Sequence, residues 1–191
     1  MKFFGSLLLV LFSFILLSCE NAENSISTQD TSLNISLISS KPNIIPTQDG
    51  FEISQFIDGN QGGTIAFDTI YVNNEGDSIQ IQTCLLFLPK SFIGIREIKM
   101  IPDFSSGSIQ FAPEMLFDKP AFLDLSYKGV DLAQLGFDSN AKIDFVYKDD
   151  NGGVEYILNN ECKINWEKQS MYVQKAKLPH FSRYVFVRKC L

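Results

Sequence analysis

The chain has 191 residues and a formal net charge of −6 at pH 7, with 17 phenylalanines and six tyrosines against a single tryptophan. We predict no nucleic-acid partner, because nucleic-acid binding depends on clustered Lys and Arg side chains and this chain is acidic. The aromatic content indicates a substantial core, and aromatic residues favour β-strands. The length suffices for one ordinary domain and a tail.

The first 18 residues have the pattern of a secretory signal. Lys2 supplies a positive charge, and an apolar run broken only by glycine and serine follows over residues 3–17. A membrane-spanning helix needs about 20 apolar residues, and this run is shorter and is followed at once by polar sequence. We therefore predict that residues 1–18 are a signal peptide that is removed.

The apolar run ends in Leu16, Leu17, Ser18 and Cys19. An aliphatic residue, a variable one, a small one and then cysteine resemble the lipobox of bacterial lipoproteins. The resemblance implies cleavage between Ser18 and Cys19, a diacylglycerol on the Cys19 thiol and an acyl chain such as palmitate on its new amino group. The alternative is a plain secretory signal with an unrelated cysteine.

Lipid on Cys19 would make the membrane a partner of this chain. Each buried methylene contributes about 0.8 kcal/mol, so several acyl chains anchor a protein stably. After loss of Lys2, 15 basic side chains face 22 acidic ones, so attraction to anionic lipid would not add to the anchor. The predicted location is the cell envelope, in the outer membrane or on a periplasmic or extracellular face.

Residues 19–49 are predicted to be the anchor and a flexible polar spacer. Ser, Asn, Thr, Gln and Asp dominate this stretch, and Pro42 and Pro46 are expected to break any regular element. A weak alternation over residues 32–37 allows one additional edge strand.

Residues 50–191 are predicted to be an all-β domain. Apolar and polar residues alternate with period two in many short segments, which places one face on a core and one in water. Residues 149–153 predict a hairpin turn, and residues 131–135 predict a single helical turn. We expect an antiparallel β-sandwich of roughly 8–10 short strands. The predicted strands are 64–72, 78–88, 95–101, 108–111, 121–127, 142–148, 154–158, 162–166, 171–178 and 183–189.

Three further cysteines, Cys84, Cys162 and Cys190, follow the anchor residue. The cell envelope can oxidise thiols, and an odd number leaves at least one cysteine without a partner in the chain. We predict a buried free thiol at Cys84 and name Cys162 and Cys190 as the candidate disulfide. No metal site and no cofactor is predicted, because no Cys-x-x-Cys pair occurs and His180 is the only histidine.

Several local patterns follow one another over roughly residues 60–190. They are Gly62-Gly63, Leu86-Phe87-Leu88-Pro89, the segment 111–123 and the closing segment Leu178-Pro179-His180-Phe181-Ser182-Arg183-Tyr184. This succession resembles the ZU-type β-sandwich module of ankyrins and netrin receptors. The resemblance implies a sandwich used for interaction or scaffolding, usually without enzymatic turnover. We expect an unknown protein or glycan as its ligand.

The closing motif carries one alternative function. The resemblance implies that some such domains cleave themselves between Phe and Ser, here at the Phe181–Ser182 bond. The Ser182 hydroxyl would attack the Phe181 carbonyl, His180 would help to move the proton and water would open the ester, which requires a strained peptide bond and an activated hydroxyl.

Two other interpretations remain open. In the first, the closing motif is structural: His180 bonds backbone at a strand entry, Phe181 packs in the core and Ser182 caps a turn. In the second, the protein binds carbohydrate through exposed aromatic side chains, with Trp166 and Tyr172 as candidates.

Overall fold

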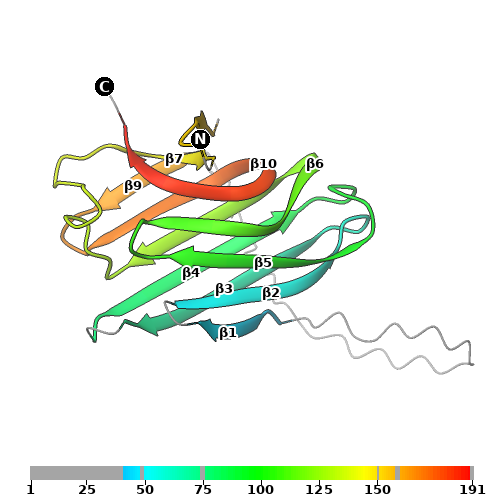
Figure 1. Ribbon diagram of the computed structural model, residues 1–191, viewed down its shortest axis with the longest axis horizontal. Helices are drawn as coiled ribbons and strands as arrows, with labels where there is room; N and C mark the ends of the chain where they lie inside the picture. Colours follow the sequence, from blue (N-terminus) through cyan, green and yellow to red (C-terminus); the bar gives the residue numbers. More distant parts are fainter. Residues whose placement is uncertain (1–40, 48–49, 74–75, 150, 158–159, 190–191) are drawn as a thin grey trace, which may run out of the picture. The chain divides into compact units, whose positions relative to one another are not determined.

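The computed structural model describes residues 41–47, 50–73, 76–149, 151–157 and 160–189. Every strand pair in this part of the chain is antiparallel, so the predicted all-β antiparallel fold is confirmed. Figure 1 shows the arrangement. The strands are β1 (Asn43–Thr47), β2 (Gly50–Asp58), β3 (Gly63–Val72), β4 (Ser78–Phe87), β5 (Ile95–Asp103), β6 (Ser108–Lys128), β7 (Ile143–Lys148), β8 (Val154–Tyr156), β9 (Glu161–Asn165) and β10 (Ser170–Arg188).

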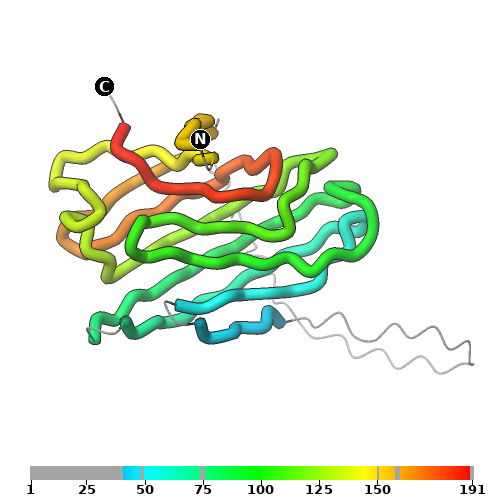
Figure 2. The backbone as a smooth tube through the Cα atoms, viewed as in Figure 1, coloured from blue at the N-terminus to red at the C-terminus, as the bar shows by residue number. Residues whose placement is uncertain are grey.

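Two long strands, β6 and β10, each belong to both layers of the sandwich. The first part of β6 pairs with β5, and its last part pairs with β4. In the same way, the first part of β10 pairs with β9 and its last part with β7, while β6 and β10 pair with each other throughout. Figure 2 shows both strands folding back at the same end of the domain. We call this end the corner, formed by residues 112–120 of β6 and 178–183 of β10.

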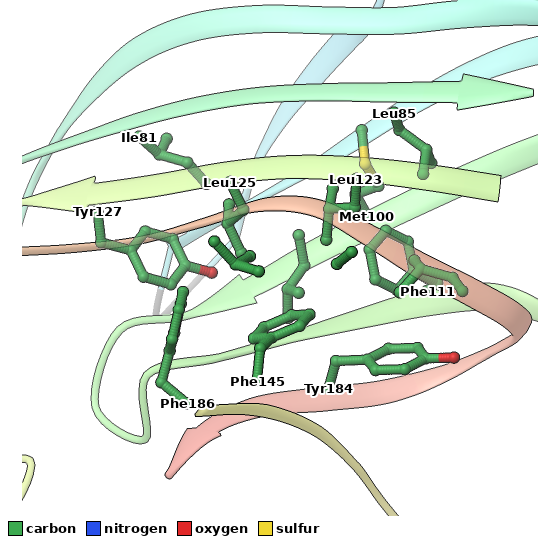
Figure 3. Close-up of a cluster of buried hydrophobic side chains, with 14 of the residues drawn as sticks. Ile81, Leu85, Met100, Phe111, Leu123, Leu125, Tyr127, Phe145, Tyr184 and Phe186 are labelled. Carbon is green, nitrogen blue, oxygen red and sulfur yellow. The ribbon is translucent and has the colours of Figure 1, made fainter. Parts of the chain in front are cut away.

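The pairing defines the two layers. One layer has the order β3-β4-β6-β10-β9, and the other has the order β1-β2-β5-β6-β10-β7-β8. Side chains from both layers meet between them, as Figure 3 shows for Leu85, Leu123 and Leu125 facing Phe145 and Tyr184. All five are at most 2% exposed. The alternation seen in the sequence thus gives two inward faces that share one core.

The structure differs from the sequence-based expectation at three places. The stretch around Pro46 was expected to contain no regular element, yet it forms β1. Because β1 is an edge strand, it tolerates a proline, which has no N–H to donate. The predicted strands 108–111 and 121–127 are the two ends of β6, and 171–178 and 183–189 both lie largely within β10. Residues 50–58, where no strand was predicted, form β2.

Two local predictions are confirmed. The hairpin turn after β7 is closed by Asp149, whose Oδ1 accepts hydrogen bonds from the backbone N of Asn151 at 2.9 Å and of Gly153 at 2.6 Å. The single helical turn is present as a hydrogen bond of 3.1 Å from the Leu135 N to the Asp131 O.

Candidate functional site

The closing motif of the sequence lies at the corner, where β10 passes from one layer to the other. His180 is opposite Leu116 and Phe181 is opposite Met115 on β6, and the next pair along β10 is Arg183 with Gln110. Ser182 therefore lies in an irregularity of the ladder. The same irregularity gives β10 the bend that it needs to change layers.

Phe181 is the centre of an aromatic cluster at the corner. Its side chain is 2% exposed. Its ring is stacked on Phe111 at a centroid distance of 4.9 Å, and it meets Phe117 at 4.8 Å and Phe87 at 5.8 Å in edge-to-face geometry. These rings come from β4, β6 and β10, so they fix the bend of both long strands. The core role expected for Phe181 is thus confirmed.

His180 is held by two tyrosines. Its ring meets Tyr147 of β7 edge-on at a centroid distance of 4.6 Å and Tyr184 at 6.0 Å. The Tyr184 hydroxyl donates a hydrogen bond of 2.6 Å to the His180 carbonyl oxygen. The His180 Nε2 lies 3.9 Å from Glu155 Oε2. His180 was expected to bond backbone at a strand entry. Instead it lies within β10, and the bond joins its own carbonyl to the Tyr184 side chain.

The pKa of the Tyr184 hydroxyl is raised well above its ordinary value, first because the group is buried and then because Glu155 is near. Tyr184 thus stays protonated across the physiological range and acts as a hydrogen-bond donor. This contact resembles the tyrosine corners of other β-sandwiches, in which a hydroxyl bonds backward along the chain.

Ser182 is half-buried and lines a shallow groove of about 330 Å³ together with His180, Glu114, Leu116 and Tyr147. In the described part of the chain, no hydrogen bond joins the side chains of His180 and Ser182. The non-glycine residues with left-handed backbone there are Lys90, Gln169 and Lys175, all away from the Phe181–Ser182 bond. These observations add no support for cleavage of the Phe181–Ser182 bond, and self-cleavage stays a prediction.

The cysteines fall into two groups. Cys84 and Cys162 are free thiols and partly buried. Burial, and then Asp144, raise the pKa of Cys162 to about 12, and its Sγ donates to Asn160 Oδ1 at 3.0 Å. Burial, and then Asp124, raise the pKa of Cys84. Both are therefore poor nucleophiles at neutral pH.

Ser18, Cys19 and Cys190 lie outside the described residues. The lipid anchor stays a prediction. The disulfide expected between Cys162 and Cys190 disagrees with the structure on the side of Cys162, whose thiol is free.

The aromatic candidates for sugar binding do not form a row on the surface. Trp166 is partly buried and packs against the core from the turn after β9. Tyr172 is half-buried at a shallow depression on the outer face of the β3-β4-β6-β10-β9 layer. The most exposed aromatic rings of the described chain are Phe56 and Tyr156, on strands at different positions in the other layer.

An exposed apolar surface lies beside the corner, and the sequence analysis does not identify it. We call it the apolar end and define it as Phe56, Ile93, Ile95 and Leu116. Leu116 is 81% exposed and Ile93 is 80% exposed, the highest values among large hydrophobic residues in the described chain. Ile93 and Leu116 line one groove, and Phe56 and Ile95 are diagonal neighbours on β2 and β5.

The loop that carries Ile93 is held in place by backbone contacts. Gly59 N donates to Gly94 O at 2.9 Å, and Ser91 N donates to Gly59 O at 3.1 Å. Ser91 is fully buried, its Oγ donates to Leu88 O at 2.7 Å, and its carbonyl accepts from Asp118 N. A Cβ on Gly59 would lie 2.3 Å from the Phe92 carbonyl oxygen, so only glycine allows this approach. Ile93 is thus presented on an ordered loop.

Within the described chain, no helix is long and apolar enough to cross a membrane. Comparison with protein-family models, with curated proteins and with solved structures gives no match. The resemblance to ZU-type modules therefore remains a prediction that rests on the sequence patterns alone.

Proposed function

We propose that this chain is a lipid-anchored lipoprotein of the cell envelope whose β-sandwich is an interaction module, of the ZU type, for a protein or glycan ligand. The observation that carries the anchor is the sequence Leu16-Leu17-Ser18-Cys19 at the end of the apolar run. The four-residue pattern ends where the apolar run ends, as the processing of a lipoprotein requires.

The interaction role is supported by the way in which the described residues are used. The corner motif is accounted for by packing and by the Tyr184 hydrogen bond. A large exposed hydrophobic surface on a soluble domain marks a binding site, and the apolar end presents such side chains on an ordered loop. An interaction module needs this kind of surface and no reacting groups.

The test is the intact mass of the chain purified from the membrane fraction under denaturing conditions. We expect residues 19–191 plus acyl chains, with incorporation of labelled palmitate. The variant Cys19→Ala should lose the label, whereas the matched variant Cys84→Ala should keep it, because Cys84 lies inside the domain. A chain that begins at Cys19 without added lipid mass would refute the anchor. A separate fragment of residues 182–191 would replace the non-catalytic role by self-cleavage.

A further inference from the structure

The most exposed hydrophobic side chains of the domain are gathered at the corner. Ile93 and Leu116 project from two different segments, the loop after β4 and the middle of β6. The backbone hydrogen bond of 2.9 Å from Asp118 N to Ser91 O holds these two segments together. The two side chains, which line one groove, therefore form a single preorganised projection.

The first described residues of the chain, ahead of β1, lie on the side of this same end. β1 runs antiparallel to β2, with Thr47 opposite Gly50 and Asn43 opposite Ser54. Going backward from Asn43, the chain is thus directed along β2 toward Asp58, which is itself opposite Ile95. The described chain consequently begins on the side of β2 that leads toward the apolar end.

The charges around the apolar end nearly balance. The cationic side chains next to it are Lys90, Arg96 and Lys119, and the carboxylates next to it are Asp58, Glu97, Glu114 and Asp118. Such a surface has no electrostatic preference for a strongly charged partner. It suits the zwitterionic headgroups and acyl chains of a neutral lipid surface.

From these observations we propose that the apolar end is a membrane contact, in which Ile93 and Leu116 insert into the boundary between headgroups and acyl chains; this inference rests on the lipid anchor of the proposed function. The tether from Cys19 to Lys41 reaches at most about 80 Å when extended, so the domain stays close to the bilayer. The tether gives the domain a high effective concentration at the membrane surface. Insertion of two apolar side chains then suffices to keep the domain in contact with the bilayer. In this arrangement the corner is the part of the domain that faces the membrane.

The experiment uses the full lipidated chain reconstituted into phosphatidylcholine vesicles. In a Trp166→Phe background, one new tryptophan is introduced by Ile93→Trp, by Leu116→Trp or, as a control, by Ile70→Trp. Ile70 is a matched control because it is 64% exposed and lies toward the far end of β3, whose first residue Gly63 pairs with Phe87 beside the corner. Emission is compared between vesicles with ordinary and with brominated acyl chains.

We expect at least about two-fold quenching for Ile93→Trp and Leu116→Trp, because inserted side chains reach about 5–10 Å into the headgroup–acyl boundary. The Ile70→Trp control should show no quenching. Lack of quenching at both corner positions, while the protein sediments with the vesicles, would overturn the membrane contact but leave the anchor intact, and would assign the apolar end to a protein partner. Lack of lipid on Cys19 in the mass spectrum would refute the anchor separately.

Discussion

Replacement of Phe181 by alanine tests the central role of the aromatic cluster at the corner. Phe181 is 2% exposed and touches three other rings, Phe87 of β4 and Phe111 and Phe117 of β6. Truncation of a buried phenylalanine costs about 3–5 kcal/mol, and the cost is high where the surroundings cannot collapse. Here they cannot, because the rings are held on two strands that the ladder fixes, so we expect a loss of about 4 kcal/mol.

The loss is measured by urea unfolding, which is monitored through the fluorescence emission of Trp166. The slope of the unfolding free energy against urea concentration should be the same in the variant and the wild type. For a domain of this size the melting temperature should fall by roughly 8–16 °C. Phe56→Ala is the matched control, because Phe56 is 49% exposed, and surface changes stay within about 0.5 kcal/mol. If Phe181→Ala cost less than about 1 kcal/mol, the corner would not depend on this packing, and the reasoning would be refuted.

Two further predictions concern polar groups. Tyr184→Phe removes the hydroxyl that donates to the His180 carbonyl and should lower the unfolding free energy by about 1 kcal/mol, since a partly buried acceptor is left without its donor. If Tyr184→Phe had no effect while His180→Ala destabilised the domain, the ring contacts of His180 and not this hydrogen bond would stabilise the corner. Asp103 is partly buried, which raises its pKa, but hydrogen bonds from Ser106 and Ser105 outweigh this and lower the pKa below 3.8. Its stabilisation is therefore complete above that ordinary value and is lost as the pH falls through the lowered pKa, so the stability difference between the wild type and Asp103→Asn, measured by urea unfolding, should be present at pH 7 and shrink below about pH 4. A difference that does not change with pH would contradict this.

The alternation of side chains made most strands predictable from the sequence. In the stretch from Ala121 to Tyr127 the odd positions are buried, because period two places them all on one face. Strand β1 was not predictable in this way, because all of its residues are exposed and it contains Pro46. It exists because the edge of β2 offers hydrogen bonds that only tertiary structure supplies.

The corner could be predicted only in part. Pro113 and Pro120 suggest an interruption in the sequence, whereas the structure shows that β6 continues through both while it changes neighbours. Such a change depends on which strands lie alongside, and a local pattern carries no information about this. The exposure of Ile93 and Leu116 could not be predicted from the sequence either. Large apolar residues are mostly buried, so a local pattern assigns them to the core.

The sharing of β6 and β10 by both layers has a consequence for the order of folding. β10 is the last strand of the described chain, and it pairs with β6, β7 and β9. Both layers contain this strand, so neither layer is complete before it has paired. The pairs between β6 and β10 join residues far apart in the sequence, and contacts of this kind give folding times of milliseconds to seconds. The two layers of the described domain should therefore be completed late, only after β10 has been synthesised and has paired with β6, β7 and β9.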